Sequence, residues 1–154
     1  IAGHFHDDCI GGLEYLQGIG VRCIANTRTI EKCIQLGLPV PDISFTDSLV
    51  LDFNGMLLDC RYFGGGHSFD NIIVWLPDQQ ILFGGCLIRS LRANSLGNLV
   101  DAVPDEWDVT VERIIQSYPE VRIVVPGHGA FGGFELLNHT IERVRIYRAN
   151  ANIY

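Results

Sequence analysis

The sequence lacks several features that mark large classes of protein. Its five cysteines include no C-x-x-C pair, which excludes a dense disulfide scaffold and argues against a zinc finger. No apolar run approaches the roughly 20 residues that a helix needs to cross a bilayer, and one of the longest is only 72–76. We therefore expect neither a disulfide-stabilised miniprotein nor a membrane-spanning segment.

Positive charge is also scarce in the chain. It has 11 lysines and arginines against 18 aspartates and glutamates, a net charge of −7, and no basic cluster. Nucleic acid and anionic membrane surfaces are therefore not expected as partners. Apolar residues, in contrast, are plentiful: 47% of the 154 residues are hydrophobic, which suits one domain with a real core.

Glycine and proline divide the chain into strand-like and helical segments. Asn54-Gly55, between two strand-like runs, predicts a tight hairpin. Gly37 with Pro39 beyond it predicts the end of a helix. Strands interleaved with covering helices indicate the α/β class. The predicted helices are 11–17, 27–36, 104–118 and 135–148, and the predicted strands are 21–25, 49–53, 56–62, 72–76, 80–83 and 123–125.

Six potential metal ligands lie in loops or at the ends of strand-like runs. His4, His6 and Asp8 form an H-x-H-x-D motif. Side chains alternate along an extended chain, so we expect these three on one side of it. The other three follow glycines, which let the backbone bend tightly: His67 in GGGHSFDN, Cys86 after two glycines, and His128 in PGHG.

The six residues divide into two sets of three. The three-histidine set contains His4, His6 and His67, and the cysteine set contains Asp8, Cys86 and His128. Three imidazoles leave zinc one open position, and a thiolate suits this borderline-soft ion. The pattern therefore predicts a hydrolase with two Zn²⁺ ions. The alternative is a non-catalytic module stabilised by zinc, but structural zinc is normally saturated by four protein ligands.

Four other polar residues are interpreted as structural or supporting. His139 lies within a predicted helix, which favours a structural role. Asp70 and Asn71 follow His67, and we expect them to orient its loop. Cys9 stands beside the metal motif and is expected to line the pocket.

The ordered motifs of the chain resemble those of the metallo-β-lactamases, in particular the dizinc subclass with a cysteine ligand. The resemblance extends from His4 almost to the end of the chain. Related thioesterase-like hydrolases such as glyoxalase II carry H-x-H-x-D-H and a bridging aspartate, where this chain has Cys9 and Cys86. The motifs are HFHDD at 4–8 followed by Gly11-Gly12, GHSFDN at 66–71, GGC at 84–86 and PGHG at 126–129.

The resemblance implies an αββα sandwich that holds two Zn²⁺ ions at the edge of its sheets, one in each ligand set. It implies hydrolysis of the β-lactam amide bond of penicillins, cephalosporins and carbapenems by a metal-bound hydroxide, and so antibiotic resistance. Asp8 and Asn98 would be catalytic, Arg89 would bind the substrate carboxylate, and Asn98 would also contact the lactam carbonyl. A loop-capping role is the alternative for Asn98. A thioester or lactone hydrolase of the same superfamily is the alternative function.

The same resemblance implies that the family's N-terminal strands are missing. We therefore expect 1–154 to be a single but partial metallo-β-lactamase domain, its C-terminal two-thirds, with exposed apolar surface and strand edges. Such a chain is expected to be unstable or inactive in isolation. A periplasmic location and a monomeric state are expected from the family, with no partner beyond the small-molecule substrate.

Overall fold

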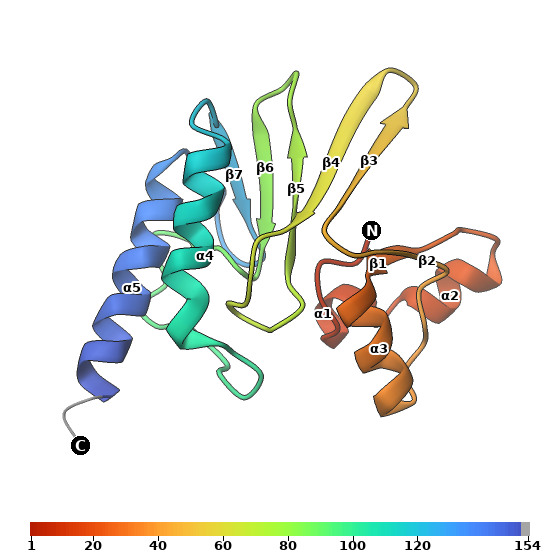
Figure 1. Cartoon of the computed structure of the whole chain (residues 1–154), viewed down its shortest axis with the longest axis horizontal. Helices are drawn as coiled ribbons and strands as arrows, with labels where there is room; N and C mark the ends of the chain where they lie inside the picture. The colour runs from red at the N-terminus through yellow and green to blue at the C-terminus, as the bar shows by residue number, and fades with distance from the viewer. Residues whose placement is uncertain (152–154) are drawn as a thin grey trace.

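The computed structural model describes residues 1–151, in which a small N-terminal lobe lies beside a larger sheet with two helices (Figure 1). The lobe contains a two-stranded parallel sheet and three helices. Its elements are α1 Asp7–Ile10, α2 Leu13–Gly18, β1 Ile24–Asn26, α3 Thr27–Leu36 and β2 Ile43–Phe45. Residues 152–154, the end of the predicted domain, lie outside the described residues.

The larger sheet has five strands in the order β3-β4-β5-β6-β7. The first four are antiparallel, and β7 runs parallel to β6. Asn54 and Gly55 both have positive φ, 55° and 87°, as the tight turn between β3 and β4 requires. The strands are β3 Ser48–Phe53, β4 Met56–Tyr62, β5 Ile72–Leu76, β6 Ile81–Gly85 and β7 Ile123–Pro126.

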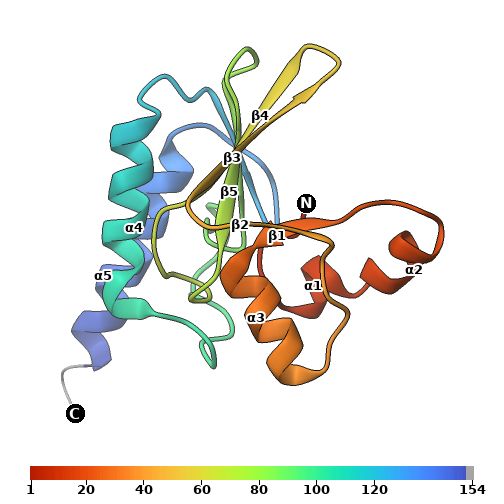
Figure 2. The same ribbon diagram turned by 45° about the vertical axis from the view of Figure 1, so that its right-hand side comes forward.

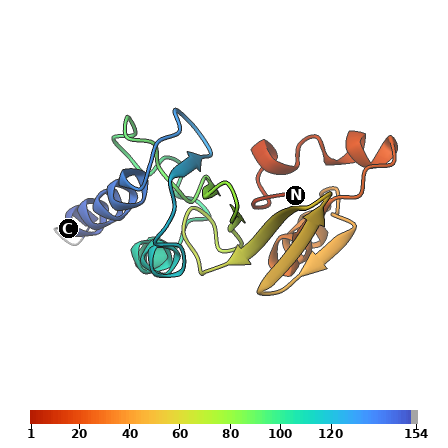
Figure 3. The same ribbon diagram turned by 90° about the horizontal axis from the view of Figure 1, so that it is seen from above.

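Two long helices, α4 Pro104–Ser117 and α5 Glu135–Ala151, cover one face of this sheet (Figure 2). Trp107 is fully buried between helix and sheet, and its Nε1 donates to the carbonyl of Leu87 at 2.8 Å. Seen from above, the helix pair and the N-terminal lobe lie at opposite ends of the molecule (Figure 3). The main core is formed by Ile73, Trp75, Leu82, Val124, Trp107, Val111, Ile114, Leu136, Leu137, Ile141 and Val144, among others.

The opposite face of the sheet carries an open apolar hollow of about 470 Å³, lined by strand residues such as Leu58, Val74 and Phe83. Phe83 is 43% exposed there. Within residues 1–151, no helix is long and apolar enough to cross a bilayer.

Local signals predicted α3 well but not the segment before it. The Asn26 side chain caps α3 by accepting from the Arg28 N–H, and Gly37 ends it with φ of 67°, so the prediction of 27–36 is confirmed. The predicted helix 11–17 is wrong in its bounds, because the chain breaks at Gly11-Gly12 and forms α1 and α2 on either side. The strand β2 was not predicted at all.

Candidate metal centre

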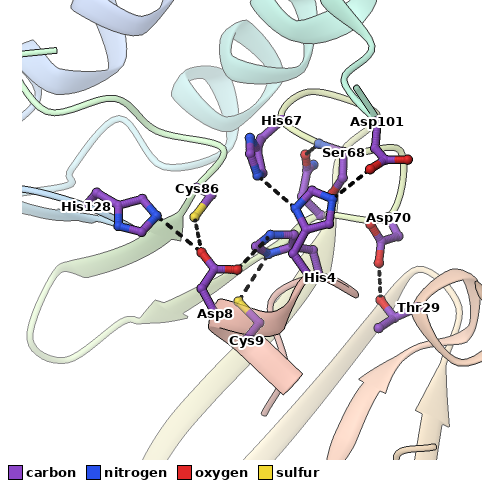
Figure 4. A network of polar contacts seen from close by, with 12 residues as sticks. His4, Asp8, Cys9, Thr29, His67, Ser68, Asp70, Cys86, Asp101 and His128 are labelled. Carbon is purple, nitrogen blue, oxygen red and sulfur yellow. Dashed lines mark hydrogen bonds and ion pairs between the residues drawn. The ribbon is translucent and has the colours of Figure 1, made fainter. Parts of the chain in front are cut away.

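All six predicted ligands come together at one end of the larger sheet, beside α1. Figure 4 labels His4, Asp8, His67, Cys86 and His128 among them. His4 and His6 lie just before α1, and Asp8 lies within it. His67 lies in the loop between β4 and β5. Cys86 directly follows β6, and His128 follows β7.

The H-x-H-x-D motif reaches this geometry differently from the prediction. Asp8 belongs to a helical turn rather than to extended chain, so the expected alternation of three side chains on one strand is wrong. The helix instead places Asp8 four residues after His4, with 3.4 Å between Asp8 Oδ1 and His4 Nε2. His4 itself precedes the helix, and the helical turn brings the Asp8 carboxylate back beside the His4 ring, so the two side chains still meet.

The three-histidine set is buried and tightly grouped. The ring nitrogens lie within 4.8 Å of one another, and His6 Nδ1 is 3.2 Å from His67 Nε2. His4 is 1% exposed and His67 is 8% exposed. Burial lowers the pKa of each to about 4, with a further contribution from neighbouring histidines. Both imidazoles are therefore neutral at pH 7, the form that binds metal.

Asp101 orients the imidazole of His6, the third member of this set, and was not predicted from the sequence. Its Oδ2 lies 3.0 Å from His6 Nε2. A carboxylate accepts, so the ring proton belongs on Nε2, and the lone pair of Nδ1 is left facing His67. No local spacing signals this contact, because Asp101 is 95 residues from His6.

The cysteine set is more exposed. Asp8 Oδ2 lies 3.2 Å from both Cys86 Sγ and His128 Nε2, and the His128 side chain is 66% exposed. Burial alone would raise the pKa of Asp8, but the Cys86 hydrogen bond and nearby His4 and His128 hold it below its usual range. Burial, followed by the Asp8 carboxylate, raises the pKa of Cys86 to about 12.

Glycine makes the close approach of the Cys86 and His128 loops possible. The Gly127 N–H donates to the Gly85 carbonyl at 2.7 Å. A Cβ on Gly127 would lie 2.6 Å from the Cys86 backbone nitrogen, closer than real Cβ atoms come. A larger residue at 127 would therefore separate two members of the cysteine set.

The residues present fit zinc. Among residues 1–151, the buried His4 Nε2 has no hydrogen-bond partner, although an unpaired buried polar atom is costly. The three-histidine set offers three nitrogens, and the cysteine set offers oxygen, sulfur and nitrogen, all donors that zinc accepts. Cys9 forms a third group of potential metal ligands together with His4 and Asp8. Its Sγ lies 3.1 Å from His4 Nδ1.

Both sets open onto one cavity of about 600 Å³, whose wall also contains Arg89, Asn98 and Leu38. Asn98 Oδ1 accepts from the Val100 N–H at 3.0 Å, which is the loop-capping contact considered above. His139 does not line this cavity, and its Nε2 lies 3.1 Å from the Ala93 carbonyl, in keeping with a structural role.

Comparison with known proteins gives consistent likenesses. No family model matches the chain. A metallo-β-lactamase type 2 from Bacteroides fragilis is 50% identical over 147 residues, covering 96% of this chain and 59% of that protein. One from Bacillus cereus is 38% identical over 145 residues, covering 94% and 57%. The solved structure of a metallo-β-lactamase from Pontibacter korlensis has a TM-score of 0.91 at 38% identity, covering 94% of this chain and 67% of that one.

The fold and the two sets of potential ligands define an α/β protein with a candidate metal centre. The chain belongs to the metallo-β-lactamase family. The αββα fold class and the family predicted from the motifs are thus confirmed, and membership implies dependence on zinc. The chain spans slightly less than three-fifths of the length of the two curated relatives, 59% and 57%.

Proposed function

We propose that the whole protein hydrolyses the amide bond of β-lactam antibiotics and so confers resistance to penicillins, cephalosporins and carbapenems. One observation carries the proposal: two sets of three potential metal ligands each contribute two side chains to the wall of a single cavity, which also contains Arg89 and Asn98. The names of the curated relatives, metallo-β-lactamase type 2, support the same activity.

In this proposal the three-histidine set holds one zinc ion and the cysteine set holds a second. Three protein ligands on each ion leave a position open for reactants, unlike the saturated four-ligand sites of structural zinc. Bound zinc lowers the pKa of a water molecule to near neutrality and polarises a carbonyl oxygen. The chain therefore needs no nucleophilic side chain of its own.

Asp8 is assigned the role of orienting the attacking water. Its Oδ2 faces Cys86 and His128, the other two members of the cysteine set, while Oδ1 is 3.4 Å from His4 Nε2 and would accept a hydrogen bond from that water. The lowered pKa keeps the carboxyl ionised at neutral pH, so it is an acceptor.

Arg89 and Asn98 are assigned to the substrate. Arg89 Nε is buried without a hydrogen-bond partner among the described residues, and the side chain lines the cavity. Its guanidinium thus has donors available for the substrate carboxylate, which it would hold by two parallel hydrogen bonds. The Val100 N–H occupies only the oxygen of the Asn98 amide. Its NH₂ group is left to donate to the lactam carbonyl, so capping and substrate contact are compatible.

The alternative is a thioester or lactone hydrolase of the same superfamily. Cys86 argues against it, because those relatives carry an aspartate there. We also propose a monomeric, periplasmic protein whose partner is the small-molecule substrate alone, with 1–154 belonging to one metallo-β-lactamase domain. Size-exclusion chromatography and cell fractionation test these two properties.

The deciding experiment is carbapenem hydrolysis by the whole protein, followed by absorbance with and without a zinc chelator. Ring opening that the chelator abolishes and added zinc restores supports the proposal. Absence of turnover with two zinc ions bound would contradict it and favour thioester or lactone substrates. One zinc ion coordinated by four protein side chains would indicate the non-catalytic module instead.

A further inference from the structure

Asp70 is a buried carboxylate at the junction of the two parts of the molecule. Its side chain is 0% exposed, and its Oδ2 accepts a hydrogen bond of 2.7 Å from Thr29 Oγ1 (Figure 4). Thr29, also 0% exposed, belongs to α3 of the N-terminal lobe. Asp70 lies in the loop between β4 and β5 of the larger sheet, so this bond ties α3 to the loop that carries His67.

Two neighbours of the histidines, Ser68 and Phe5, also affect the pKa of the Asp70 carboxyl. Burial raises its pKa, while the Ser68 hydroxyl, Thr29 and the Phe5 N–H oppose that rise. Ser68 follows His67 in sequence, and Phe5 lies between His4 and His6. Ser68 Oγ and Asp70 Oδ1 are both buried without a hydrogen-bond partner among residues 1–151, so the bond to Thr29 is the hydrogen bond that ties the carboxyl to another segment.

We infer that Asp70 is a positioning residue that holds the His4–His6 segment and the His67 loop at a fixed separation. These two segments are distant in sequence, and the 3.2 Å between His6 Nδ1 and His67 Nε2 depends on how they are held. A side chain that only filled space here would be apolar, since burying a carboxyl carries a desolvation cost. The bond of Asp70 to Thr29 joins the His67 loop to α3, and α3 packs through Cys33 in the same apolar cluster as Phe5, which lies between His4 and His6.

The position of Asp70 predicts that it affects metal binding by the two ligand sets unequally. Asp70 belongs to the loop that carries His67 and is bonded to α3 of the lobe that carries His4 and His6, whereas Cys86 and His128 are positioned by the Gly85–Gly127 contact on the other side of the centre. Loosening the Asp70–Thr29 contact should therefore weaken the three-histidine set more than the cysteine set, in which only Asp8 shares a segment with His4 and His6. The inference rests on the proposed ligand assignment, but not on any activity.

The test uses Thr29→Val, which removes the hydroxyl while keeping the side-chain shape, with Thr29→Ser as the matched control that retains it. The whole protein is loaded with Co²⁺. The thiolate absorption band reports the cysteine set, and competition with a chelator gives the affinity of the three-histidine set. We expect Thr29→Val to weaken the three-histidine set about 10-fold, the lower end for loss of a residue that supports metal ligands. The thiolate band should not change, and Thr29→Ser should behave like the unmodified protein.

Asp70→Asn provides a second variant, expected to act in the same direction and more strongly because the charged acceptor itself is lost. Unchanged affinity of the three-histidine set in folded Thr29→Val would overturn the inference. Equal weakening of both sets would also overturn it, since that is the effect of general destabilisation. Failure of the unmodified protein to bind Co²⁺ at the three-histidine set would instead overturn the ligand assignment in the proposed function.

Discussion

The two ligand sets differ in how far the protein organises them before any metal binds. In the three-histidine set, His4 and His67 are buried and neutral, and Asp101 orients His6. In the cysteine set, His128 is mostly exposed and Cys86 is a protonated thiol with a pKa of about 12. One set is therefore ready to coordinate a cation, and the other must first lose a proton.

The two proposed metal sites are therefore unequal, although their side chains line the same cavity. Burial lowers the pKa of an imidazole and so favours its ligand form, but it raises the pKa of a thiol and disfavours the thiolate. The same apolar surroundings thus favour the three-histidine set and oppose the cysteine set. We expect zinc to bind first to the three-histidine set. The charge of this first ion would assist binding at the cysteine set only by favouring the ionised forms of Asp8 and Cys86.

Removal of one ligand from each set should produce the largest effects. Structural zinc sites with four ligands bind with about 10–16 kcal/mol, or roughly 3 kcal/mol per ligand. His67→Ala should therefore weaken the three-histidine set by more than about 100-fold and leave the protein unable to hydrolyse its substrate. Cys86→Ser should retain tight binding of one zinc ion and lose the second, with reduced turnover. Zinc titration of each variant by mass spectrometry under native conditions checks the stoichiometry, and unchanged binding and rate in Cys86→Ser would disprove its ligand role.

The metal-free protein should lose stability in acid because of the buried histidines. Their folded pKa of about 4 lies below the ordinary value of 6.5, so the unfolded chain binds more protons between these values. Their contribution is present above pH 6.5 and is lost as the pH falls to about 4. The pKa difference corresponds to an upper limit of roughly 3 kcal/mol for each histidine.

Urea unfolding of the metal-free protein between pH 7.5 and pH 4.5 measures this loss. His67→Gln, which cannot take up a proton, is the control and should have a shallower dependence on pH. Identical slopes in both proteins would show that His67 is not held neutral by burial.

The number of protons released on metal binding should distinguish the two sets more directly. At pH 7 neither His4 nor His67 carries a proton that a metal must displace, and Asp8 is already ionised. Binding at the cysteine set, however, must remove the proton of Cys86. Calorimetric titration in buffers of different ionisation enthalpy should show about one more proton released by the unmodified protein than by Cys86→Ser, which retains only the proton released by zinc-bound water. If Cys86→Ser released as many protons as the unmodified protein, the released proton would not come from Cys86.

The residues that could be predicted from sequence are those with local signals. The hairpin at Asn54-Gly55 and helix α3 depend on nearby turn and cap residues, and both were predicted correctly. The motifs predicted six metal ligands, and these residues lie together in the structure. Their roles in metal binding stay predictions. Asp101 and the Asp70–Thr29 bond could not be predicted, because each depends on segments 95 and 41 residues apart that meet only in the folded chain.

The smallest effect is expected from Asp101, which touches the three-histidine set through one imidazole. Asp101→Ala removes the acceptor for His6 Nε2–H and lets the ring rotate and exchange its proton between nitrogens, so the set should lose about 10-fold in metal affinity. Asp101→Asn keeps a neutral acceptor and should lose less. Asp105→Asn, at an exposed position in the first turn of α4, is the matched control for loss of charge near the centre. The thiolate band of the Co²⁺ protein should be the same in all three variants, because Asp101 contacts neither Cys86 nor Asp8. If Asp105→Asn weakened binding as much as Asp101→Ala, the effect would come from loss of negative charge near the centre. Orientation of His6 by Asp101 would then no longer support the view that the three-histidine set is organised before metal binds.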